Sequence, residues 1–170
     1  FDTKCVPDEL IPYMGLLGST LSLMDTKNYT YPELTNEINI NCGGLATGTA
    51  LYSDKVDFSK NTIVYEVKSK ALYEKVPFVL GMMEEIMYNT RFDDYKRLKE
   101  IIARIKSRLD ASLMGQGHSI AMLECCAQFS ESAYYSDILR GYKYYEFIKK
   151  LDEEFEQNKT KIVDKLNKLV

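Results

Sequence analysis

The sequence predicts an α+β fold: a two-layer domain in which helices pack on one face of an antiparallel sheet, with a helical C-terminal part. Two observations lead to this prediction. Apolar residues recur at three- and four-residue steps in the first 24 residues and again after residue 73, which is the period of a helix. Residues 61–71 instead alternate between apolar and polar side chains, which is the period of a half-buried strand.

The first predicted element is a helix over residues 8–24. Pro12 lies near its start, where a missing amide hydrogen costs least. The polar residues 25–28 then break the pattern. The expected buried stripe of this helix consists of Leu10, Tyr13 or Met14, Leu17, Leu21 and Met24.

A second helix is predicted from a capping box, the pattern T-x-x-E, which Thr30 and Glu33 form. This helix should end near Asn41. Gly43 and Gly44 follow, and glycine readily takes the left-handed conformation that closes a helix.

Two strands come next, over residues 45–52 and 61–71, joined by the polar connection 53–60. Two strands alone are marginally stable, so the sheet needs at least one more strand. We expect residues 1–4 to be the stub of that strand. The predicted inward-facing residues of the second strand are Ile63, Tyr65 and Val67.

The rest of the chain is predicted to be helical, and the glycines of Gly115-Gln116-Gly117 should interrupt its longest helix. We expect residues 1–170 to be a single domain fragment with an α+β core over 1–128 and a helical extension over 129–170. In chain order, the predicted helices begin at Tyr73, cover residues 92–114, 120–129 and 132–138, follow Gly141 as an aromatic stretch, and finish with a helix capped by Asn158.

Two of these helices have apolar stripes that predict their buried faces. The helix that begins at Tyr73 should bury Val76, Val79 or Leu80, Met83, and Ile86 or Met87. The helix over residues 92–114 should bury Leu98, Ile101, Ile102, Ile105, Leu109 and Leu113.

Composition argues against several classes of partner. Hydrophobic residues make up 45% of the chain and charged residues 28%, which is typical of a globular domain. The net charge is −3 and no basic cluster occurs, so we expect no nucleic-acid partner. No apolar run approaches the ~20 residues that span a bilayer, and no secretory signal opens the sequence, so we expect no membrane partner.

The four cysteines indicate a reducing compartment. Cys125 and Cys126 are adjacent on a predicted helix, where their side chains diverge, and no C-x-x-C pair occurs. Together with Cys5 and Cys42 they are expected to be buried or partly buried thiols. The sequence therefore predicts a cytoplasmic location.

No complete catalytic, cofactor-binding or metal site can be assembled from these residues. A catalytic zinc ion takes three protein ligands, and His118 is the only histidine. We expect His118 to hydrogen-bond into a helix start. Gly115-Gln116-Gly117 lacks the spacing of a phosphate-binding loop, and the adjacent Glu84 and Glu85 point apart as a polar helix face. A self-contained enzyme that uses His118 and Cys125 is the least favoured hypothesis.

Several short segments together carry a family resemblance, with their order and spacing kept over nearly the whole chain. They are Pro12-Tyr13 with Leu16-Leu17, residues 31–38 with Gly43-Gly44, residues 65–72, residues 91–94 with 97–100, residues 106–109, Gly115-x-Gly117-His118 with Ala121, Phe129-Ser130, and Gly141 with Tyr144 and Phe147. The chain thereby resembles the third domain, at the start of the C-terminal half, of insulinase-type (pitrilysin-type) zinc metallopeptidases, in the presequence-protease-like branch.

The resemblance implies a parent enzyme whose two similar halves close around a chamber. Its first domain carries the zinc motif H-x-x-E-H, in which the glutamate is the general base for the zinc-bound water. This chain has no H-x-x-E-H, so the zinc belongs to the parent and is not ligated here, and the fragment alone should be inactive. The implied partners are the sister domains of the same parent chain and an unfolded peptide substrate.

Two hypotheses about function remain. The first is a non-catalytic chamber-wall domain of a zinc-dependent metalloendopeptidase that degrades unfolded peptides. The alternative is a structural or peptide-holding domain of a proteolytically inactive relative, because a fold does not settle function. Under either, we expect an unpaired sheet edge and an apolar face that sister domains cover, so the isolated fragment should self-associate or be of low stability.

Overall fold

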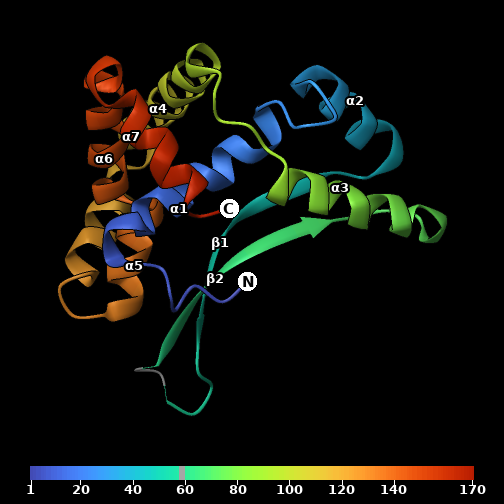
Figure 1. Cartoon of the computed structure of the whole chain (residues 1–170). Helices are drawn as coiled ribbons and strands as arrows, with labels where there is room; N and C mark the ends of the chain where they lie inside the picture. The colour runs from blue at the N-terminus through green and yellow to red at the C-terminus, as the bar shows by residue number, and fades with distance from the viewer. Residues whose placement is uncertain (58–59) are drawn as a thin grey trace.

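The computed structural model describes residues 1–57 and 60–170, and it confirms the α+β fold. Two antiparallel strands form a long, curved ribbon with helices against it (Figure 1). The helices are α1 (Ile11–Thr20), α2 (Tyr31–Asn41), α3 (Val76–Tyr88), α4 (Tyr95–Cys126), α5 (Glu131–Arg140), α6 (Tyr142–Glu153) and α7 (Phe155–Asn167), and the strands are β1 (Leu45–Ser53) and β2 (Asn61–Ser69).

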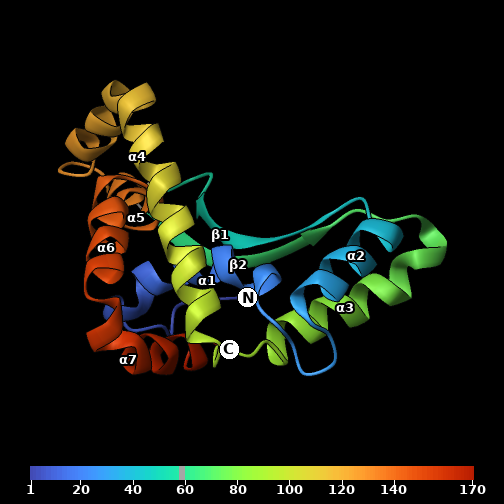
Figure 2. The same cartoon turned by 90° about the horizontal axis from the view of Figure 1, so that it is seen from above.

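The helices form two groups. Seen from above, α4–α7 gather at one end of the molecule and α2 and α3 at the other, while the sheet and α1 connect them (Figure 2). Within the described ranges, no helix is both long enough and apolar enough to cross a bilayer.

One face of the sheet packs against the helices, as predicted. The hydroxyl of Thr47 in β1 donates a hydrogen bond to the carbonyl of Gly18 in α1 at 2.9 Å. The predicted inward-facing residues of β2 are confirmed, since Tyr65 is buried and Ile63 and Val67 are partly buried against the core.

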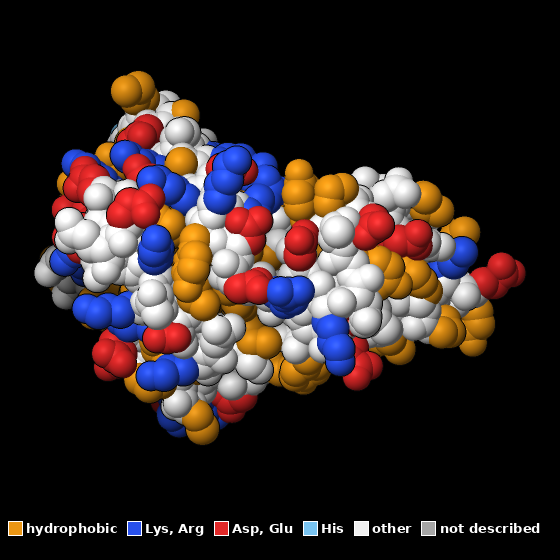
Figure 3. Space-filling model, turned by 45° about the horizontal axis from the view of Figure 1, so that its top comes forward, with side chains coloured by type: hydrophobic (Ala, Val, Ile, Leu, Met, Phe, Trp, Pro, Cys, Tyr) orange, Lys and Arg blue, Asp and Glu red, His pale blue; other side chains and the backbone are white. Residues whose placement is uncertain are grey.

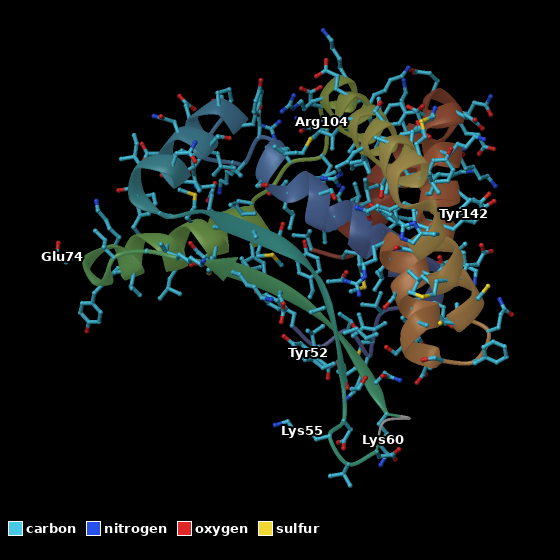
Figure 4. The ribbon with its side chains drawn as sticks, turned by 180° about the vertical axis from the view of Figure 1, so that it is seen from behind. Tyr52, Lys55, Lys60, Glu74, Arg104 and Tyr142 are labelled. Carbon is cyan, nitrogen blue, oxygen red and sulfur yellow. The ribbon has the colours of Figure 1, made fainter. Side chains whose placement is uncertain are left out.

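The reverse face of the sheet is open. A Cβ atom built at Gly48 would meet nothing within 4 Å, and no helix covers this face in the view from behind (Figure 4). Its polar residues pair with one another, because the Tyr52 hydroxyl and the Lys68 ammonium both contact the carboxylate of Glu66.

The N-terminal residues lie along the outer edge of β2, where the stub of a third strand was predicted. Asp2 forms an antiparallel bridge with Val64. The Phe1 ammonium donates to the Tyr65 carbonyl at 2.8 Å, and the Tyr65 amide donates back to the Phe1 carbonyl at 3.0 Å. The chain turns at Lys4, so the segment forms a single bridge rather than a strand.

Helix α1 is the centre of the hydrophobic core. Short 3-10 helices at Asp8–Leu10 and Leu21–Leu23 extend it to the predicted range. It contacts β1, α4, α5, α6 and α7. Every residue of its predicted stripe is buried, and Leu16 is fully buried as well. Leu139, Ile148 and Leu166 join the same cluster, and the division of the chain at residue 128 stays a prediction.

The start of α2 is the predicted capping box. The carboxylate of Glu33 accepts from the Thr30 amide at 3.0 Å, and this hydrogen bond holds the pKa of Glu33 below its usual value. Asp25 adds a second cap by accepting from the Tyr31 amide at 2.7 Å. The helix ends before Gly44, which has a φ of 121° and so takes the left-handed region predicted for it.

The buried face predicted for α3 is partly wrong. Val79, Ile86 and Met87 are buried, but Val76 is 41% exposed, and Met82 takes the core position that the pattern assigned to Met83. Nearly every residue in this helix is apolar, so two neighbouring stripes fit the spacing equally well. Packing against α2 selects between them.

The glycines of Gly115-Gln116-Gly117 kink the long helix rather than end it. Helix α4 runs on to Cys126, and Gln116 has the non-helical angles φ −131° and ψ 25°. Glycines lower the preference for helical backbone, which explains a kink at this point.

The predicted cap at Asn158 is wrong. Helix α6 ends at Glu153, and α7 already begins at Phe155. Asn158 therefore lies within the helix, where its side-chain amide donates to the carboxylate of Glu154 at 3.1 Å.

Glu85 is a buried carboxylate that ties α3 to the loop before α2. It accepts from the backbone amide and the side-chain amide of Asn28 at 3.0 and 2.8 Å, and from the side chain of Asn89 at 2.7 Å. Burial by itself raises the pKa of Glu85, but hydrogen bonds from Thr26, Asn28 and Asn89 outweigh it and leave the pKa below its usual value. The expected polar face is therefore right for the exposed Glu84 and wrong for Glu85.

Replacing Glu85 with glutamine is expected to lower the free energy of unfolding by about 1–3 kcal/mol at neutral pH, because an amide NH₂ then faces hydrogen-bond donors. Since the folded pKa of Glu85 is depressed, its contribution is present above the unfolded pKa of about 4.3 and is lost as pH falls through the folded value. Urea unfolding of both proteins at decreasing pH checks this, with Glu84→Gln as the control. A difference that does not shrink at low pH would contradict the assignment.

Candidate functional site

The two residues of the self-contained enzyme hypothesis do not meet. His118 and Cys125 are both exposed on α4 beyond its kink. A helix rises about 1.5 Å per residue, so about 10 Å separates them along the axis, which is too far for proton transfer. The expected hydrogen bond of His118 to a helix start is also wrong, because α4 continues through this residue and its side chain has no hydrogen-bond partner among the described residues.

The thiols are more exposed than the sequence indicated. Cys5, Cys125 and Cys126 are exposed, and Cys42 is partly buried. The last turns of α4 explain the difference for the adjacent pair. This part of the helix extends beyond the core, so that Met122 is 65% exposed as well. All four thiols are unpaired in the structure.

No metal centre is assembled in the part of the chain that the structure describes. Within residues 1–57 and 60–170, no three side chains of His, Cys, Asp or Glu lie close enough to share a metal ion. A zinc ion of the kind that the family resemblance implies does not fit these residues, and no reaction step is assigned to them.

The feature best suited to a functional contact is an apolar groove between α3 and the outer edge of β2. The groove has a volume of about 370 Å³ and is lined by Phe1, Tyr65, Val67, Met83, Glu84, Met87 and Tyr88. Next to it, α3 exposes Val76 and 60% of Leu80. We call the apolar residues Phe1, Val67, Val76, Leu80, Met83, Met87 and Tyr88 the α3–β2 surface. Hydrophobic side chains are frequent over this end of the molecule in Figure 3.

The strand edge beside this surface is open to further pairing. Tyr65 points its backbone amide and carbonyl outward to Phe1. Groups two and four residues further along a strand point the same way, so Val67 and Ser69 present theirs to the outer edge as well. The edge can therefore accept an extended chain that runs antiparallel to β2.

The sequence predicted an open edge and an apolar face but not the residues that form them. Phe1 was assigned only to a strand stub, and Met83 to the core. The groove joins three segments that lie far apart in the chain, and a periodic pattern reports on one helix or strand at a time. The exposed Leu80 was the one available signal, as the alternative that the stripe of α3 left open.

Comparison with known proteins gives the family. The model of the domain associated with metallopeptidase family 16, subfamily C, matches residues 1–151. The chain is 32% identical over 99% of its length to protein HypA of Clostridium perfringens, and 30% identical over 89% to the mitochondrial presequence protease of Yarrowia lipolytica. It is 27% identical over 92% to presequence protease 1, chloroplastic/mitochondrial, of Arabidopsis thaliana.

The chain spans only 17%, 15% and 15% of the lengths of these three relatives. The match to the family nevertheless covers most of the chain, and the resemblance to insulinase-type peptidases of the presequence-protease-like branch is confirmed. The chain belongs to the family of domains associated with metallopeptidase family 16, subfamily C.

Proposed function

We propose that this chain is a non-catalytic chamber-wall domain of a zinc-dependent metalloendopeptidase that degrades unfolded peptides. The observation that carries the proposal is family membership over residues 1–151, with relatives named presequence protease. Two further observations support it. The catalytic candidates His118 and Cys125 lie apart and exposed, and the chain corresponds to about a sixth of its relatives' length.

The α3–β2 surface is the proposed contact with sister domains. It combines exposed apolar side chains with a strand edge that presents backbone donors and acceptors. Both features favour burial against another part of a longer chain, since exposed apolar patches and open edges otherwise promote association.

Zinc content and peptide hydrolysis, measured on this chain and on a full-length parent, test the proposal. The parent should hold about one zinc ion per chain and cleave an unstructured peptide, while the 170-residue chain does neither. A parent without zinc or activity would favour the structural or peptide-holding alternative. Stoichiometric zinc and hydrolysis by the isolated chain would overturn both.

The isolated chain is expected to self-associate through the α3–β2 surface. Leu80→Glu should shift it toward the monomer, because a carboxylate in the centre of the surface must be desolvated when two copies meet. Sedimentation velocity at increasing protein concentration measures this.

Met122→Glu is the matched control, because Met122 is 65% exposed on a helix at the other end of the molecule and Leu80 is 60% exposed. Equal effects of the two substitutions would show that added charge, rather than this surface, governs association.

We also propose a cytoplasmic location. The support is the four thiols, which form no disulfide in the structure. Three of them are exposed, and exposed thiols persist in a reducing compartment.

A further inference from the structure

A second hollow lies between α1, β1 and α4, on the other side of the molecule's centre from the α3–β2 surface. Its volume is about 470 Å³, and its polar lining includes Ser19, Thr47, Arg104 and Arg108. Leu23, Ile101 and Ile105 supply apolar walls. Arg104 lies at the side of α4 that faces α1 (Figure 4). We call this hollow the Arg104 pocket.

Two arginines of the Arg104 pocket lack a carboxylate partner. Arg104 and Arg108 are one turn apart on α4, so they share a face and repel each other. Among the described residues, neither has an acidic oxygen within the distance of an ion pair, and Glu100, one turn earlier, pairs with Arg97 at 3.5 Å. An anion placed between the two guanidinium groups would remove this repulsion.

A buried hydroxyl beside the pocket also lacks a partner. Tyr144 of α6 is only 5% exposed, and its hydroxyl makes no hydrogen bond with a described residue. Its ring lies against α1, since a Cβ atom on Gly15 would come within 2.9 Å of it. Burial raises the pKa of Tyr144 to about 12, and the neighbouring Ser19 and Arg108 partly oppose this rise. The hydroxyl is therefore a neutral donor close to the two residues that line the pocket.

We propose that the Arg104 pocket binds a peptide carboxylate, either a C-terminal carboxylate or the side chain of an acidic residue. Planar guanidinium groups match the two oxygens of a carboxylate, and the hydroxyls of Ser19 and Tyr144 supply further donors. The apolar walls suit a carboxylate on an aliphatic chain better than a bare inorganic anion. This site does not depend on the proposed function, because its test measures binding to this chain alone.

Two pairs of short peptides test the proposal. One pair differs only in a C-terminal carboxylate or carboxamide, and the other only in an internal glutamate or glutamine. NMR titration of the arginine Nε–Hε signals should show binding of the acidic member of at least one pair, about tenfold tighter than its neutral partner. The pair that responds tells which kind of carboxylate the pocket takes.

Variants separate this pocket from general charge attraction. Arg104→Gln with Arg108→Gln should weaken binding about tenfold, whereas Arg140→Gln with Lys149→Gln, which removes the same charge elsewhere, should leave it unchanged. Tyr144→Phe should weaken binding without lowering the free energy of unfolding, because it removes an unpartnered buried hydroxyl. Equal binding of acidic and neutral peptides, no binding of any peptide, or equal weakening by both double variants would overturn the proposal.

Discussion

Truncation of Leu16 to alanine is expected to lower the free energy of unfolding by about 4 kcal/mol. Leu16 is fully buried in α1, the helix that contacts the sheet and four of the other helices. Removing its side chain loses the transfer free energy of the buried atoms and leaves a cavity, which packed neighbours on several sides cannot fill. Domains of this size are stable by about 5–15 kcal/mol, so the variant should be only marginally folded.

Urea unfolding followed by circular dichroism measures this effect, and Leu80→Ala is the matched control. Leu80 is the same residue type in a helix, but 60% of it is exposed, so its truncation should change stability by about 0.5 kcal/mol or less. A loss at Leu80 as large as that at Leu16 would mean that the α3–β2 surface is buried in the isolated chain. The self-association measurement would then identify the partner as a second copy.

A methyl group at Gly18 is expected to destabilise the protein by about 2 kcal/mol. Helix α1 crosses β1 at this residue, and a Cβ atom there would lie 2.9 Å from the Cα of Gly48 and 3.2 Å from the carbonyl oxygen of Thr47. Both contacts are with backbone, so the helix itself must move away from the strand. That movement also stretches the hydrogen bond from the Thr47 hydroxyl to the Gly18 carbonyl.

Gly81→Ala provides the opposite expectation. Gly81 is exposed in α3, and a Cβ atom built there meets nothing within 4 Å. Alanine should stabilise this helix by about 0.5–1 kcal/mol, because it restricts the unfolded backbone. Thermal and urea unfolding of both variants should therefore give changes of opposite sign. A stabilising Gly18→Ala would show that α1 and β1 can separate without loss.

Local signals in the sequence were reliable wherever one element decided the outcome. The stripe of α1, the capping box at Thr30 and Glu33, and the alternation of β2 all appeared as predicted, because each depends on residues within a few positions of one another. The errors occurred where local signals were ambiguous. In α3 two stripes fitted equally well, and at Asn158 a plausible cap residue lay inside a helix.

The candidate surfaces lie beyond what such signals can report. The α3–β2 surface combines Phe1 with residues of β2 and α3, and the Arg104 pocket combines Ser19, Thr47 and two arginines of α4. In the sequence these arginines look like an ordinary solvated helix face. Only the structure shows that a hollow lies beside them and that neither has a carboxylate partner among the described residues.

The sequence by itself determined the fold class, the order of the elements, the face of β2 that is buried and the family resemblance, since periodicity, caps and motif spacing are written in consecutive residues. The tertiary structure alone decided which stripe of α3 enters the core, how closely α1 crosses β1 at Gly18, and which side chains from distant segments share a groove. The physical reason is that packing depends on distances between elements, and these arise only when the helices and strands compete for the same buried space.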